Sequence, residues 1–193
     1  EAAVALLDSS ICLTDEQANS LLDSIARLLK SNDPNEEFEM KYGGDNSDPF
    51  TMSLNTIRPI AIRALAKWIK KSSRNGRIAE AFNILEAFLP DRSRSDADAA
   101  AIGEALPWIV ETNAEWATNR RAAIFGEDKA NRRQQIALTT VLSLYILSPQ
   151  MLDFCSPAII QALNDQAKPY TLGFRFDGSD CVTLIGEKLY RAY

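Results

Sequence analysis

The residues of this chain that could do chemistry are a Gly/Asp/Asn loop, a run of basic side chains and several pairs of carboxylates. The loop, KYGGDNSDPF at residues 41–50, has no G-K-[ST] sequence and no preceding strand, so it does not match a phosphate-binding loop. It also lacks the alternate spacing and the distal Glu of a calcium-binding EF-hand. We interpret it as a connector that brings the chain into a helix.

The chain contains no histidine, and it has three cysteines, none of them in a C-x-x-C pair. The missing histidine excludes Ser–His and Cys–His catalysis and histidine-based zinc sites. An odd number of unpaired cysteines predicts a reducing compartment, so we expect a cytoplasmic protein. Cys155 and Cys181 lie in apolar sequence, which indicates buried and unreactive thiols.

Neighbouring carboxylates could act as an acid–base pair only inside a closed pocket. The pairs are Glu36/Glu37, Asp96/Asp98 and Glu127/Asp128. All three lie in expected loops or at helix starts, where acidic residues favour the helix dipole. We therefore expect no catalytic residues, no metal site and no cofactor.

One set of basic residues is the candidate partner-binding surface, and its members from Arg63 on fall on a single helical stripe. The set, here called the basic stripe, consists of Arg58, Arg63, Lys67, Lys70 and Arg74. It could meet an acidic protein surface or nucleic-acid phosphates, neutralise the acidic residues at 33–48, or simply face solvent. The net charge of −5 argues against nucleic acid, and a protein partner is favoured over it.

The elements that would position these residues have the helical period. Thr14 and Gln17 form a capping box ahead of an apolar stripe, whereas residues 32–53 read as a loop. Asn55 is the expected N-cap of the next helix, which is followed by a second helix that ends at Pro90.

Further helix signals follow in the second half of the chain. Ser95 and Asp98 have capping-box spacing, and Pro107 is expected to kink or split the helix that they start. Residues 136–146 predict a helix buried on more than one side. Ser148–Pro149 and Ser156–Pro157 each predict the start of a short helix. Residues 169–182 are expected to form a loop, with a small hairpin as the alternative.

These patterns predict an all-α fold, either an α-solenoid or an irregular bundle of antiparallel helix pairs, in one domain over residues 1–193. Helix pairs recur at about 35 to 45 residues, the size of HEAT or armadillo units. No stretch approaches the about 20 apolar residues of a membrane span, so we expect no membrane contact. Because the first residue is Glu1, we expect the chain to be a fragment of a longer protein.

One helix entry resembles a pattern of the helical-repeat regions of large bacterial STAND-type NTPases. The matching residues are Asn55, Thr56, Arg58, Ala61, Ala64 and Leu65, with Pro59 where Gly is usual. A second segment is similar through Leu106, Pro107, Trp108, Trp116, Ile124 and Phe125. The resemblance covers about residues 53–163 and implies a C-terminal recognition or scaffold module, with the NTPase elsewhere in the parent chain.

The function predicted from the sequence is therefore a non-catalytic helical module that binds a protein partner through its surface. Two other classes stay open. One is an all-α enzyme with a carboxylate-lined groove, and the other is a DNA-binding helical module.

Overall fold

The computed structural model describes residues 13–42, 48–72, 76–89, 95–125 and 132–164, together with Gly186. Across these residues the chain forms nine helices and no strand, so the predicted all-α class is confirmed. The predicted loop or hairpin at 169–182 lies outside the described residues, as do Arg74, Cys12, Cys181, Glu127 and Asp128.

Helix α2 (Asp15–Leu28) begins with the predicted capping box, in which Thr14 and Gln17 satisfy each other's backbone N–H groups. Its side chains Leu22 and Ile25 are fully buried. The indole N–H of Trp68 donates to the carbonyl of Ala18 at 2.8 Å, so α2 is fixed to the helix that carries Trp68.

The predicted loop at 32–53 is wrong as one continuous loop, because two short helices form within it. These are α3 (Glu36–Tyr42) and α4 (Pro49–Leu54). Helix α4 starts where Asp48 accepts hydrogen bonds from the N–H groups of Phe50 and Thr51, a local cap that loop composition concealed. Asn55 closes α4, so the next helix has Thr56 as its N-cap and not Asn55.

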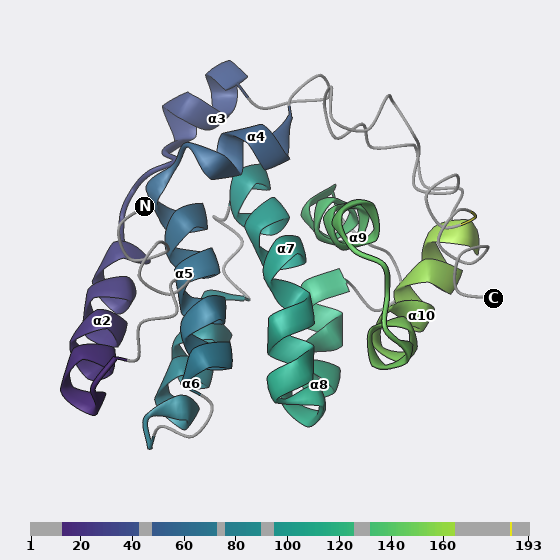
Figure 1. Ribbon diagram of the computed structural model, residues 1–193. Helices are drawn as coiled ribbons and strands as arrows, with labels where there is room; N and C mark the ends of the chain where they lie inside the picture. Colours follow the sequence, from purple (N-terminus) through teal and green to yellow (C-terminus); the bar gives the residue numbers. More distant parts are fainter. Residues whose placement is uncertain are drawn as a thin grey trace.

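Six longer helices follow as three successive pairs. They are α5 (Ile57–Lys71), α6 (Ile78–Phe88), α7 (Asp96–Thr112), α8 (Ala114–Phe125), α9 (Arg132–Leu144) and α10 (Pro149–Asn164). Figure 1 shows α2, α5 and α7 side by side, with α6 and α8 as a second layer behind α5 and α7. Helix α9 is seen nearly end-on in the same view, so it crosses α7 steeply and the stacking of the pairs becomes irregular there.

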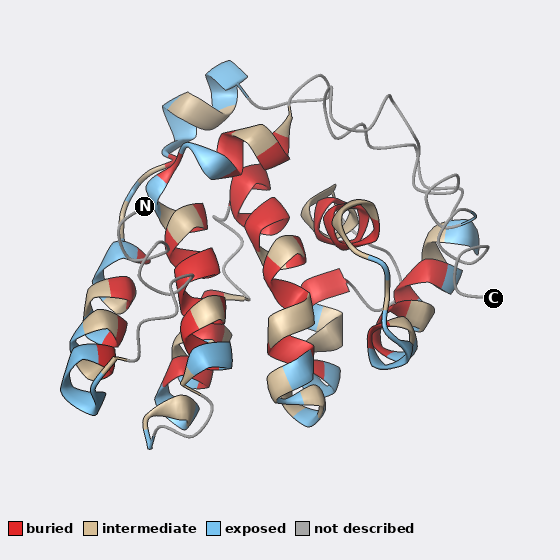
Figure 2. Cartoon of the chain, viewed as in Figure 1, coloured by how far each residue is buried: buried red, intermediate tan, exposed pale blue. Residues whose placement is uncertain are grey.

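Helix α7 lies between α5 and α9, and it carries much of the buried surface in Figure 2. Small residues let its neighbours approach closely. A Cβ atom added to Gly103 would lie 2.3 Å from the carbonyl oxygen of Ala137 on α9. Every residue of α9 from Ile136 to Leu142 is buried, which confirms the predicted burial on more than one side.

The aromatic side chains belong to the core, as expected. Trp68 is fully buried, and Trp108 and Trp116 are half-buried against the same cluster. Phe82 of α6 meets the ring of Trp116 on α8 at 5.0 Å between centroids, so the helices of the back layer also contact each other.

Two prolines predicted to interrupt helices lie inside continuous ones. Pro107 does not split α7, and Pro157 lies within α10 instead of starting a new helix. Each proline removes one helical hydrogen bond. Buried neighbours on both sides hold the segment in place, including Leu106 and Ile109 in α7. The packing of these side chains therefore overrides the local signal.

Candidate functional site

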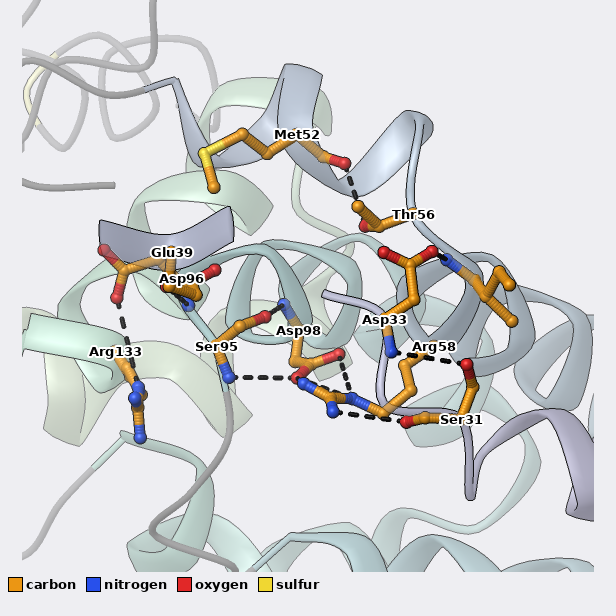
Figure 3. Close-up of polar contacts among 11 residues, drawn as sticks. Ser31, Asp33, Glu39, Met52, Thr56, Arg58, Ser95, Asp96, Asp98 and Arg133 are labelled. Carbon is orange, nitrogen blue, oxygen red and sulfur yellow. Dashed lines mark hydrogen bonds and ion pairs between the residues drawn. The ribbon is translucent and has the colours of Figure 1, made fainter. Parts of the chain in front are cut away.

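Arg58, the first residue of the basic stripe, is bound inside the fold. Its Nη2 atom lies 2.7 Å from Oδ2 of Asp98 on α7, and Nη1 donates to the carbonyl of Ser31 at 3.3 Å. Asp98 is completely buried and also caps α7 with Ser95. This one guanidinium therefore joins the end of α2 to α5 and α7 (Figure 3).

Arg63 is buried rather than displayed, with 5% of the residue exposed. Its Nε donates to Glu104 on α7, Nη1 donates to the carbonyl of Ser53 at 2.6 Å, and Nη2 donates to the hydroxyl of Ser53. The ring of Phe50 lies 5.8 Å from the centre of its guanidinium. Arg63 thus joins α4, α5 and α7.

Arg58 and Arg63 are therefore engaged within the fold and not open to a partner, because this face of α5 packs against α7. Acidic side chains on α7 meet the stripe at Asp98, Glu104 and Glu111. The six- and seven-residue steps between these acids were visible in the sequence. Their role was not, since it depends on which helix packs against α5.

Lys67 and Lys70 are the two described stripe residues at the surface. The ammonium of Lys67 lies 5.5 Å from the ring centroid of Trp108. Lys70 pairs with Glu111 at 3.2 Å, and both side chains are at least half exposed. An exposed pair of this kind contributes about 0 to 1 kcal/mol, so Lys70 can exchange Glu111 for another carboxylate at small cost.

A groove of about 370 Å³ opens beside this pair. It is lined by Pro107, Glu111, Tyr145, Ile146, Ser148, Gln150 and Met151. Two of its lining residues are held by hydrogen bonds: the Tyr145 hydroxyl donates to the carbonyl of Glu104 at 2.8 Å, and the Gln150 amide donates to the carbonyl of Val110 at 3.3 Å. Burial raises the pKa of Tyr145 to about 12, so its hydroxyl stays a donor at neutral pH.

The groove escaped the sequence analysis because Tyr145 and Ile146 read as the end of an apolar helix. In the fold α9 stops at Leu144, and in the non-helical segment 145–148 Ile146 is 76% exposed. A large exposed isoleucine at a helix end next to Ser148–Pro149 is the signal that could have indicated this surface.

A second polar cluster surrounds the start of α7. Ser95 and Asp98 form the predicted capping box, and Asp96 pairs with Arg132 at 2.7 Å. The Asp96 N–H donates to Oε2 of Glu39 on α3 at 3.3 Å, and burial raises the pKa of Glu39. The carboxylates here thus serve caps and ion pairs. No group of three acidic or cysteine side chains in the described ranges could hold a metal ion.

The thiol of Cys155 is expected to be unreactive in the folded protein. Cys155 is completely buried in α10, and burial raises its pKa to about 12, so the thiolate is scarce at neutral pH. Iodoacetamide labelling at pH 7, followed by mass spectrometry of the Cys155 peptide, should show modification only after denaturant is added. Labelling of Cys155 at the unfolded rate in buffer would contradict its placement.

Comparison of the chain with family models, with curated proteins and with solved structures gave no match. The resemblance to the helical-repeat regions of STAND-type NTPases therefore stays a prediction. Within the part of the chain that the structure describes, every helix is too short or too polar to cross a membrane.

Proposed function

We propose that this chain is a non-catalytic helical recognition module that holds a short segment of a protein partner. The observation that carries the proposal is the groove at the end of α7 with Lys67 and Lys70 beside it. The charged residues between α5 and α7 support a structural role for this interface, because their ion pairs join the two helices.

The lining of the groove indicates the kind of segment that it would accept. Ile146 and Pro107 offer apolar surface, while Ser148 and Gln150 offer polar atoms that could bind the backbone of an extended peptide. Lys70 would pair with an acidic residue of that peptide after leaving Glu111. The partner segment therefore combines an apolar side chain with a neighbouring Asp or Glu.

The larger setting is part of the same proposal. The module would belong to a longer cytoplasmic bacterial protein of the STAND type, in which an NTPase region lies elsewhere. The residues that support this setting are the helix entry at Asn55–Leu65 and the segment from Leu106 to Phe125.

Peptide display tests the proposal directly. A random peptide library is selected on the immobilised wild-type chain, and binding of the enriched peptides is measured on Ile146→Asp and on Lys67→Glu/Lys70→Glu. Ile146→Asp should weaken binding about tenfold or more, since a buried isoleucine contributes about 1.5 to 3 kcal/mol. Lys67→Glu/Lys70→Glu should weaken it by a smaller factor, because exposed ion pairs contribute about 0 to 1 kcal/mol. In the Lys67→Glu/Lys70→Glu variant, peptide affinity should also fall less with added salt than it does in the wild type.

Lys30→Glu is the matched control, because it reverses an exposed lysine at the far end of α2. It should leave peptide affinity unchanged. Peptides that bind all four proteins equally would show that this groove is not the recognition surface, and a library without enriched peptides would argue against the module as a peptide binder.

A further inference from the structure

We propose that α3 is a pH-sensitive latch, which Glu39 holds against the start of α7 more firmly when its carboxyl group is protonated. This device lies at the opposite end of α7 from the groove. It goes beyond the proposed recognition function and does not depend on it.

Helix α3 is only lightly attached to its neighbours. The helix has seven residues and none of them is buried. Asn35 caps it through a hydrogen bond from the Phe38 N–H at 2.8 Å, and the rings of Phe38 and Tyr42 contact each other within the helix. These interactions stabilise α3 itself and do not join it to its neighbours.

The chain just before α3 is attached much more firmly. Asp33 accepts a hydrogen bond from the Ile57 N–H on its carboxylate at 2.8 Å, and its carbonyl accepts from the Arg58 N–H at 2.9 Å. Residues near Asp33 therefore form a fixed base from which α3 can move. The contact that joins α3 to α7 is the hydrogen bond from the Asp96 N–H to Glu39 (Figure 3).

The surroundings of the Glu39 carboxylate disfavour its negative charge. Its Oε1 atom is buried and forms no hydrogen bond within the described part of the chain. Burial is the main cause that raises the pKa of Glu39, and the charges of Asp96 and Asp98 on α7 raise it further. The hydrogen bond from Asp96 and the charge of Arg133 on α9 act in the opposite direction but do not cancel the rise.

The other cations near this site are already engaged. Arg132 pairs with Asp96 at 2.7 Å, and Arg58 pairs with Asp98 at 2.7 Å. Protonation of Glu39 would remove its negative charge, which is partly buried and lies near the carboxylates of Asp96 and Asp98. One oxygen would still accept the Asp96 N–H.

The sign of the effect follows from linkage. A free Glu39 has its ordinary pKa of 4.5, and the docked Glu39 has a higher one. The docked state therefore binds the proton more tightly, and docking weakens as the pH rises from 4.5 through the raised pKa. Acidification from neutral pH closes the latch, and neutral pH loosens it.

Hydrogen exchange measured by NMR tests the latch on the full chain. Protection factors of the α3 amides, which correct for the intrinsic effect of pH on exchange, are compared at about pH 5 and about pH 7.5. We expect protection in the wild type to be several-fold higher at the lower pH. Glu39→Gln, which mimics the protonated carboxyl group, should be highly protected at both pH values.

Glu37→Gln is the matched control, since Glu37 is an exposed carboxylate on the same helix. It should show the same pH dependence as the wild type. Equal protection of wild-type α3 at the two pH values would overturn the proposal, as would a Glu39→Gln variant that follows the wild-type pH curve.

A direct titration keeps the test decisive even if the glutamine variant folds poorly. The carbon-13 shift of the Glu39 carboxyl group in the wild type should titrate with a midpoint above 4.5. The protection of α3 should change over the same pH range. A midpoint at or below the ordinary value would also overturn the latch.

Discussion

Replacing Arg63 by alanine is expected to lower the free energy of unfolding by about 3 kcal/mol or more. The side chain is buried and its guanidinium binds Glu104 and two oxygens of Ser53. Its removal would leave the Glu104 carboxylate, whose side chain is 19% exposed, without its partner. It would also leave the buried Ser53 without these donors, which costs more than the bonds themselves contribute.

Urea denaturation followed by circular dichroism measures this loss. Lys70→Ala is the matched control, since it removes a cation from the same helix that pairs with the same neighbouring helix at the surface. It should change stability by less than about 1 kcal/mol. The double replacement Arg63→Met with Glu104→Leu should recover part of the loss, because no unpaired charge then remains. If Arg63→Ala were as stable as Lys70→Ala, the structural role of Arg63 would be contradicted.

A second large effect is expected where α7 crosses α9. Alanine at position 103 would bring its Cβ to 2.3 Å from the Ala137 carbonyl oxygen and 2.8 Å from Cβ of Thr140. These atoms belong to the α9 backbone and to a branched side chain, so α9 itself must move. We expect Gly103→Ala to lower stability by about 2 kcal/mol or more, although alanine favours an isolated helix by about 1 kcal/mol over glycine.

The same substitution elsewhere separates crowding from the loss of glycine. Gly76→Ala adds a Cβ that meets nothing within 4 Å, and it should change the urea midpoint little. If Gly103→Ala were as stable as Gly76→Ala, the close approach of α7 and α9 would be wrong.

Much of the fold was predictable because its signals are local. The capping boxes at Thr14/Gln17 and Ser95/Asp98 each depend on residues three apart, and both form as expected. The apolar stretch of α9 likewise indicated its burial. A local signal misled the prediction at Pro157, which was expected to start a new helix and lies inside α10.

The candidate sites were much less predictable, because each depends on segments that are distant in sequence. The spacing from Arg63 to Lys70 gave a common face but not the acidic helix opposite it. The groove forms where Pro107 and Glu111 of α7 lie close to Ile146 and to Met151 of α10. The hydrogen bond between Asp96 and Glu39 depends on α3, a short helix in a segment with the composition of a loop.

The ion pairs between α5 and α7 also fix how far one helix can slide along the other. Arg58 meets Asp98, Arg63 meets Glu104 and Lys70 meets Glu111, so the partners advance together and the helices run in the same direction. A shift of about one turn, 5.4 Å, would place Arg63 opposite either Ala100 or Trp108 and break all three pairs at once. Alanine-rich surfaces such as that of α7 offer little shape to prevent slippage, and here the charges provide the alignment that shape does not.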